Sequence, residues 1–262
     1  METRVFPSGS QLGENLASII VTGILQAKQS GKPYVLGCPA GRSGRTTYRA
    51  LSRMIAREKI PVDHLFIVLM DAYVSRVENS FEQIPKGWHC SCHRFAEEEI
   101  IGPINLAAPQ GSGIPDDHVW VPDPNSANEF DAKIGSIGGI DLFLLASGST
   151  DGHVGFNPPG SSRDSRTRVL ELAESTRRDN LKTYPDFDSL GDVPRYGVTV
   201  GISTIADLAR SAVLITCGTE KATTFNRLSS CVKYDESWPA SVIWDCRNPS
   251  IFSDAAAAGT SG

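Results

Sequence analysis

Two short segments of the chain carry residue types that perform acid–base chemistry. Asp71 directly follows the apolar run 65–70, and a carboxyl group desolvated by such a run has a raised pKa, which suits a general base. Asp151 and His153 stand two residues apart across a glycine, close enough for the carboxylate to orient an imidazole that exchanges protons near neutral pH. Taken alone, each segment is also typical of a turn or a structural loop, so neither decides the function.

A glycine-rich segment, residues 37–48, is suited to holding an anion. Gly41 and Gly44 let the backbone bend closely around a ligand, and Ser43 offers a hydroxyl. Arg42 adds positive charge, and the helix expected after the turn adds free N–H groups. The segment matches neither GxxxxGK[ST] nor GxGxxG and therefore does not indicate a nucleotide. A phosphate site and an ordinary glycine turn with exposed arginines are both consistent with it.

The elements that must position these segments alternate between apolar strands and helical patterns. Near-continuous apolar strands separated by helices indicate a mostly parallel sheet covered on both faces. Ligands of such sheets bind outside the carboxyl ends of the strands, where residues 38–46, the stretch from Asp71 and residues 146–160 would meet. Strands are expected at 34–37, 65–70, 118–121, 140–145, 196–201, 212–216 and 250–253. Helices are expected around 16–25, 48–55, 95–101, 126–137, 203–210 and 219–229.

Composition narrows the class of protein. The 262 residues are 40% hydrophobic and 21% charged, typical of a globular chain, and we expect one α/β domain over 1–262 with residues 255–262 as a frayed tail. A net charge of −5 argues against general nucleic-acid binding, and no apolar run approaches the roughly 18–20 residues that span a membrane. The N-terminus lacks a signal-peptide pattern and the six cysteines lack the spacing of a disulfide framework. These features predict a soluble cytoplasmic protein with reduced thiols.

The order of several motifs resembles the glucosamine-6-phosphate deaminases. The resemblance runs from about residue 34 to residue 254, and the superfamily also contains the 6-phosphogluconolactonases. It implies a three-layer α/β/α sandwich with a mostly parallel, modified Rossmann-like sheet. The motifs are the glycine-rich segment 37–48, Met70-Asp71-x-Tyr73, Asp151-Gly-His153 with Phe156-Asn157, Pro159-Gly-Ser-Ser162, Ser165-Arg-Thr-Arg168, Val193-Pro-x-Tyr196 with Thr199-Val-Gly201, and Gly218-x-x-Lys-Ala222.

The resemblance implies a role for each site residue. Asp71 would move a proton between C2 and C1 of an open-chain sugar phosphate, and His153, oriented by Asp151, would open the pyranose ring. The 6-phosphate would be held by Gly41, Arg42, Ser43, Lys182 and Lys221, and the backbone around Ser147 and Gly148 would line the sugar hydroxyls. The implied partner is a phosphorylated sugar, with a homo-oligomer as a further possibility. No metal or organic cofactor is implied.

The chain departs from the deaminase pattern at several positions, including Arg42 and Arg45, which the phosphate loop has gained. Pro158 stands where the deaminases have a glutamate that supports the histidine, and a proline side chain cannot hydrogen-bond. Ala72 replaces the acidic residue that usually follows the base aspartate. Leu170 replaces a lysine that binds the allosteric effector, so the resemblance does not extend to that regulation.

Two other functions stay open from the sequence. The first is a 6-phosphogluconolactonase, in which the histidine would activate water against a lactone. The absence of the glutamate favours this function, and the motifs after His153 disfavour it. The second is a catalytically silent sugar-phosphate sensor, which Pro158 suggests and the joint presence of Asp71, Asp151 and His153 argues against.

A cluster of histidines and cysteines at residues 89–93 invites a zinc interpretation. The sequence His-Cys-Ser-Cys-His lacks the C-x₂₋₄-C spacing of tetrahedral zinc sites, and no second cluster accompanies it. Four potential ligands packed this closely would also strain a single site. We therefore expect the segment to be an active-site lid or the start of the following helix.

Overall fold

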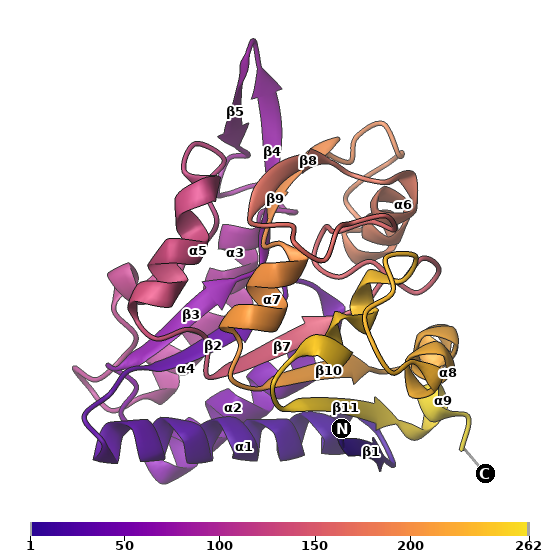
Figure 1. Cartoon of the computed structure of the whole chain (residues 1–262). Helices are drawn as coiled ribbons and strands as arrows, with labels where there is room; N and C mark the ends of the chain where they lie inside the picture. The colour runs from indigo at the N-terminus through magenta and orange to yellow at the C-terminus, as the bar shows by residue number, and fades with distance from the viewer. Residues whose placement is uncertain (1, 261–262) are drawn as a thin grey trace.

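A parallel sheet forms the centre of the computed structural model, which describes residues 2–260. Seven strands are arranged in the order β1-β11-β10-β7-β2-β3-β6, and each neighbouring pair is parallel (Figure 1). The strands are β1 (Glu2–Phe6), β2 (Tyr34–Cys38), β3 (Leu65–Leu69), β6 (Val119–Trp120), β7 (Leu142–Ala146), β10 (Ala212–Thr216) and β11 (Pro249–Asp254). The predicted mostly parallel sheet is confirmed, although β1 carries too little apolar periodicity for the sequence to predict it.

Helices cover both faces of this sheet because side chains alternate along each strand. Along β7, Leu142 and Leu144 pack into the core beneath α1 and α2, whereas Phe143 and Leu145 pack on the opposite face with α5 and α7. The first face carries α1 (Gly9–Gln29), α2 (Arg45–Glu58) and a helical segment made of α3 (Cys92–Ala96), a π-helical turn (Glu97–Ile101) and α4 (Gly102–Ala107). The second carries α5 (Ala127–Ser136), α7 (Ile202–Leu208) and α8 (Ala222–Ser230). The expected three-layer sandwich is therefore observed.

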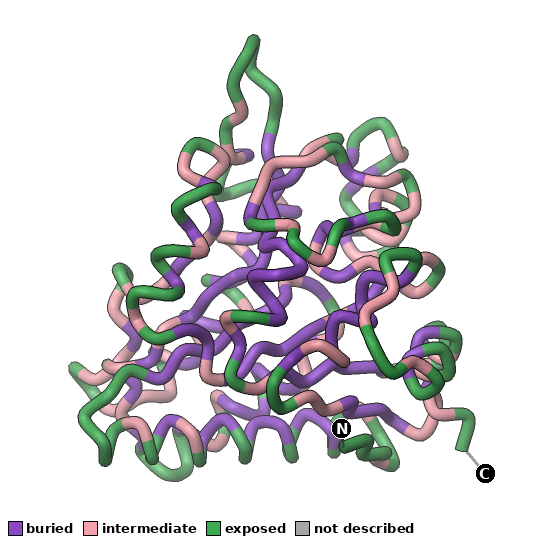
Figure 2. Tube along the Cα trace, in the orientation of Figure 1, coloured by how far each residue is buried: buried purple, intermediate pink, exposed green. Residues whose placement is uncertain are grey.

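A second, antiparallel sheet with the order β5-β4-β9-β8 stands above the first (Figure 1). Its strands are β4 (Asp71–Val77), β5 (Ser80–Gln83), β8 (Arg168–Glu171) and β9 (Tyr196–Thr199), and α6 (Glu174–Thr183) follows β8. The sequence predicted a strand at 196–201, and the structure has β9 there. This strand belongs to the second sheet, because β9 pairs with β4 in the antiparallel direction. Figure 2 shows that the tip of the β4–β5 hairpin is exposed while the base of β4 is buried.

The C-terminal segment is more ordered than its alanine-rich composition suggested. The prediction of a frayed tail over 255–262 is wrong for residues 255–258, which form the short helix α9 (Ala255–Ala258). The side chain of Asp254 caps this helix by accepting a hydrogen bond from the backbone N–H of Ala257, and Ala257 is buried. Residues 261 and 262 lie outside the described residues. Among the residues that are described, no helix combines the length and apolar character that crossing a bilayer requires.

Candidate active site

The cavity that gathers the predicted residues lies at the switch point of the parallel sheet. From β2 the strand order runs outward to β3 and β6 on one side and to β7, β10 and β11 on the other. The segments that follow β2, β3, β7 and β10 all line one cavity of about 190 Å³. This volume is below the roughly 300–1,000 Å³ of pockets for drug-sized ligands, so it suits a small metabolite. The position is the one that α/β sheets commonly use for ligands.

Asp71 lies at the buried floor of this cavity. It is the first residue of β4, and its side chain is 7% exposed. Burial raises the pKa of Asp71 to about 7, although a hydrogen bond from the Cys92 thiol and the charge of His153 act in the opposite direction. The Cys92 Sγ lies 3.7 Å from Oδ1 of Asp71. A carboxyl group with this pKa can both accept and return a proton near neutral pH, as the sequence predicted for this position.

Asp151 and His153 form a hydrogen-bonded pair on the loop that follows β7. The His153 Nδ1 lies 2.8 Å from Oδ1 of Asp151, and the same oxygen accepts the backbone N–H of His153 at 3.1 Å. Burial opposes ionisation, but the hydrogen bonds from His153 and Ser175 hold the pKa of Asp151 well below its usual range. An ionised carboxylate only accepts, so Nδ1 carries the proton. His153 itself lines the cavity and Asp151 lies behind it.

Two glycines let this loop pack closely around its own side chains. A Cβ on Gly148 would overlap Nδ1 of His153 and lie 2.5 Å from Oδ1 of Asp151. Gly155 has φ 55°, and a Cβ there would lie 2.8 Å from Oγ1 of Thr199 and 3.4 Å from Oδ2 of Asp71. The loop therefore passes directly against both the His153–Asp151 pair and Asp71. It brings two groups that are 82 residues apart in the sequence to the same cavity.

Gly41, Arg42, Ser43 and Lys221 also line the cavity. Gly41 adopts φ 103°, a conformation that other residues rarely adopt, and it opens the turn that presents Arg42 and Ser43. Arg42 forms an ion pair with Glu220 at 3.8 Å. Lys221 is buried and donates a hydrogen bond to the Ser147 carbonyl, and this burial lowers the pKa of its ammonium group. Ser147 and Gly148 also line the cavity, as predicted.

Lys182 is the predicted site residue that the structure does not bring to the cavity. Its helix, α6, directs Thr176, Asp179 and Thr183 into the cavity, at the spacing of one helical face. Lys182 lies next to Thr183 in the sequence but is exposed and lies outside the residues that line the cavity. Among the residues that line the cavity, the cationic side chains are therefore Arg42 and Lys221.

Known proteins resemble this chain in both sequence and fold. A glucosamine-6-phosphate deaminase of Rhodococcus opacus is 33% identical over 266 residues, which covers 98% of this chain and 92% of that protein. The chain belongs to the glucosamine-6-phosphate deaminase family. A glucosamine-6-phosphate isomerase of Candida albicans is 29% identical over 265 residues and covers 99% of this chain and 98% of that protein. None of the family models compared with the sequence matches it.

Solved structures extend this relationship to the fold. A monomeric glucosamine-6-phosphate deaminase superposes with a TM-score of 0.83 at 25% identity, covering 100% of both chains. A 6-phosphogluconolactonase from Trypanosoma brucei superposes with a TM-score of 0.71 at 18% identity, covering 100% of this chain and 98% of that one. The second likeness shows a shared fold. The family and the fold class expected from the motifs are thus confirmed.

The sequence did not predict several polar residues that lie at this cavity. Ser175 and Thr176, at the start of α6, contact the Asp151–His153 pair, and Cys92 contacts Asp71. Asp179 lines the cavity and accepts the backbone N–H of Ser149 at 3.4 Å. A cluster of serine, threonine and acidic residues in 174–179 was visible in the sequence. It gave no sign of which side chains face the cavity, because α6 carries a single apolar residue and so has no apolar face that would reveal its orientation.

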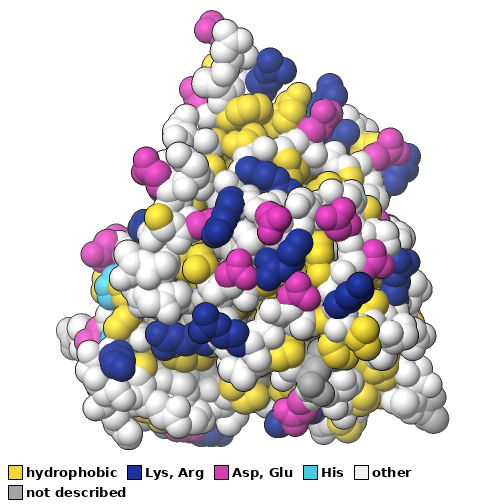
Figure 3. Space-filling model, viewed as in Figure 1, with side chains coloured by type: hydrophobic (Ala, Val, Ile, Leu, Met, Phe, Trp, Pro, Cys, Tyr) yellow, Lys and Arg dark blue, Asp and Glu magenta, His cyan; other side chains and the backbone are white. Residues whose placement is uncertain are grey.

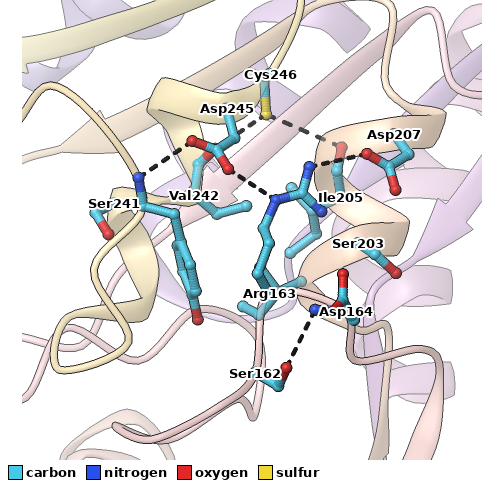
Figure 4. Close-up of polar contacts among 12 residues, drawn as sticks. Ser162, Arg163, Asp164, Ser203, Ile205, Asp207, Ser241, Val242, Asp245 and Cys246 are labelled. Carbon is cyan, nitrogen blue, oxygen red and sulfur yellow. Dashed lines mark hydrogen bonds and ion pairs between the residues drawn. The ribbon is translucent and has the colours of Figure 1, made fainter.

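The loop that carries Asp151 and His153 is anchored on its far side by Arg163. The Nε of Arg163 donates to Asp245 at 2.7 Å, and an Nη donates to Asp207 on α7 at 2.9 Å (Figure 4). Figure 3 shows Lys and Arg side chains interspersed with Asp and Glu side chains across this face. Ion pairs of this exposure contribute up to about 1 kcal/mol each. Their arrangement fixes the loop between α7 and the segment that ends at Asp245.

The histidine–cysteine cluster at residues 89–93 does not converge on one point. His93 Nε2 lies 2.8 Å from Gln83 Oε1, and the His89 ring packs against Phe187 with centroids 4.4 Å apart. Cys92 instead points to Asp71. Within residues 2–260 no group of three or more His, Cys, Asp or Glu side chains is placed to hold a metal ion. The segment contains the start of α3, which agrees with the expectation that it leads into the following helix.

Proposed function

We propose that this chain is a deaminating isomerase that converts a glucosamine 6-phosphate-like sugar to a fructose 6-phosphate-like ketose and ammonia, with the consumption of one water molecule. The observation that supports this most strongly is the placement of Asp71 and of His153, which is paired with Asp151, on one cavity that Arg42 and Lys221 also line. The family relationship points to the same reaction. The substrate, a phosphorylated sugar, is the partner that this site requires.

The chemistry begins with ring opening by His153. Its Nδ1 proton is engaged by Asp151, so the proton exchange with substrate falls to Nε2. In the proposed step, Nε2 accepts the proton of the C1 hydroxyl and delivers a proton to the ring oxygen as the C1–O5 bond breaks. The product of this step is the open-chain aldehyde, which acidifies the neighbouring C–H at C2.

Asp71 then moves a proton from C2 to C1. The ionised carboxylate accepts the C2 proton while the aldehyde oxygen takes up a proton, which gives an enolamine. The enolamine takes the first proton back at C1 as its nitrogen gives up a proton, which yields an imine at C2 and a hydroxyl group at C1. Water adds to this imine, and ammonia leaves as the ketone forms. A base with a pKa of about 7 suits the step, since it is substantially ionised at neutral pH and still binds the proton that it must return.

The 6-phosphate would bind beside Arg42 and Lys221. The guanidinium of Arg42 and the ammonium of Lys221 supply charge, and the turn at Gly41 and Ser43 supplies N–H and O–H donors. The sugar hydroxyls would lie against the backbone of Ser147 and Gly148. No step in this sequence uses a metal ion or an organic cofactor.

An assay of ammonia release tests the proposal. The purified chain is incubated with hexosamine 6-phosphates, and ammonia and ketose 6-phosphate are measured together, with Asp71→Asn and the exposed Lys182→Ala as paired variants. We expect equal amounts of the two products, loss of at least about 100-fold in kcat for Asp71→Asn, and little change for Lys182→Ala. The absence of ammonia release from every hexosamine 6-phosphate would contradict the proposal.

A 6-phosphogluconolactonase is the second candidate function. The observation that favours it is Pro158, which removes the glutamate that supports the histidine in deaminases. In this reaction His153 would activate water against the lactone carbonyl, and Asp71 would have no proton to transfer between carbons. A lactone-hydrolysis assay run beside the ammonia assay separates the two. Binding of sugar phosphates with no turnover in either assay would instead indicate a sensor.

Location and assembly are further predictions. All six cysteines are free thiols, which agrees with the reducing cytoplasm proposed from the sequence. A homo-oligomer was considered from the sequence, whereas the solved deaminase with a TM-score of 0.83 is described as monomeric. Sedimentation of the purified chain at several concentrations decides between these states.

A further inference from the structure

We propose that Ser175, on helix α6, is a positioning residue that holds Asp151 in the orientation from which Asp151 holds His153. The proposal rests on the function proposed above, since it concerns the histidine that opens the sugar ring. Neither the motif resemblance nor the family relationship assigned a role to Ser175. The proposal adds to that function the residue that supports His153 in a chain where Pro158 replaces the family's glutamate.

The Asp151 carboxylate is held through both of its oxygens. Oδ1 accepts the backbone N–H of His153 at 3.1 Å and lies 2.8 Å from Nδ1 of the ring. Oδ2 accepts the hydroxyl of Ser175. With Oδ1 committed to the histidine, the Ser175 hydroxyl is the contact that fixes the rotation of the carboxylate about its Cβ–Cγ bond.

The neighbouring residue completes the support. Thr176 is buried, and its Oγ1 lies 3.3 Å from Nδ1 of His153, on the side of the ring that faces α6. The side chains of His153 and Asp151 are 13% and 14% exposed, so water competes weakly for these hydrogen bonds.

Pro158 makes this support necessary. It lies on the far part of the loop, outside the residues that line the cavity, and its side chain cannot accept or donate a hydrogen bond. The side chain that precedes it, Asn157, is engaged with the carbonyls of Val154 and Val200 and does not reach the ring. The hydroxyls of Ser175 and Thr176, both on α6, therefore supply the support that a glutamate on the loop would give to the histidine.

Ser175→Ala tests the proposal, with Ser175→Thr as the conservative variant and Glu174→Gln as the matched control. Glu174 is the preceding residue, and its exposed carboxylate forms an ion pair with Arg178, also on the surface. Steady-state kinetics with the hexosamine 6-phosphate substrate are combined with the inhibition constant of the corresponding sugar alcohol 6-phosphate, which has no ring to open. The Nδ1 proton resonance of His153 in NMR gives a readout that does not need turnover.

We expect Ser175→Ala to lower kcat by about 10- to 100-fold while KM and the inhibition constant of the sugar alcohol stay within about 2-fold. The Nδ1 proton resonance should shift and exchange faster with solvent. Ser175→Thr should restore most of kcat, and Glu174→Gln should match the unmodified chain. The proposal is overturned if Ser175→Ala keeps kcat within about 2-fold, or if binding of the sugar alcohol is lost to the same extent as kcat. An unmodified chain that releases no ammonia contradicts the proposed function instead, and that result is known before any variant is compared.

Discussion

The thiol of Cys92 lies 3.7 Å from Oδ1 of Asp71, so the proposed base is buried beside a weak hydrogen-bond donor. This pairing sets a testable relationship between the two residues. Cys92→Ala removes a donor to the ionised carboxylate, so the pKa of Asp71 should rise further, and the acid limb of the kcat/KM profile should move to higher pH. Cys92→Ser supplies a stronger donor and should move the limb to lower pH. Cys90→Ala, which removes a buried thiol in the same segment without a contact to Asp71, should leave the limb in place.

The raised pKa of Asp71 also predicts how stability depends on pH. The folded chain binds the Asp71 proton up to a pH of about 7, whereas the unfolded chain releases it near 3.8, so this group lowers the free energy of unfolding as pH rises from about 4 to about 7. The difference between the two pKa values corresponds to about 4 kcal/mol at most. Asp71→Asn should therefore be more stable than the unmodified chain at pH 8 and equally stable near pH 4. Urea unfolding at both values measures this, and equal stabilities at pH 8 would show that burial does not penalise the charge.

A third prediction concerns Arg42, one of the two residues proposed to bind the phosphate. Arg42 and Glu220 form a half-exposed ion pair at 3.8 Å, and a phosphate group must compete with Glu220 for the guanidinium. Glu220→Gln removes that competitor and should lower KM by about 2- to 5-fold, in keeping with the small free energy of exposed pairs. Arg42→Ala should raise KM by about 10-fold. Lys182→Ala should change KM by less than about 2-fold, and a 10-fold rise in that variant would show that α6 moves to bring Lys182 to the ligand.

Gly155 offers a test of how closely the loop must approach Asp71. Gly155→Ala would place a Cβ 2.8 Å from Oγ1 of Thr199 in a backbone with φ 55°, so we expect a loss of about 1–3 kcal/mol in stability and a lower kcat. Gly160→Ala is the matched control, since it has φ 88° but no atom within 4 Å of the added Cβ. It should share the backbone strain and keep kcat. Equal kcat values for the two variants would show that catalysis does not depend on the close packing of this loop against Asp71.

The sequence predicted the parallel sheet well because its strands are nearly continuous apolar runs, such as 65–70 and 212–216. The second sheet was harder to predict. Its strand β8 carries Arg168 and Glu171 and is only partly buried, so it lacks the apolar run that marks a central strand. The pairing of β4 with β9 depends on contacts across more than 100 residues, which local patterns do not encode.

The candidate site was likewise only partly predictable from the sequence. Asp71, Asp151 and His153 follow strands of one sheet, so their convergence could be expected from topology. The contacts from α6 could not be expected, because they depend on which face of that helix turns toward the cavity. This is why the sequence assigned a ligand role to Lys182 and none to Ser175.

Exchange of the C1 hydrogen tests the central claim most directly, that Asp71 and His153 act on one sugar phosphate in this cavity. The ketose 6-phosphate is incubated with the chain and ammonium chloride in deuterium oxide, so that the imine at C2 can form, and the C1 proton signals are followed by NMR. We expect the unmodified chain to exchange one C1 hydrogen with solvent, Asp71→Asn to lose this exchange, and His153→Gln to slow it by impairing ring opening. Exchange that persists in Asp71→Asn, or none in the unmodified chain, would contradict the account.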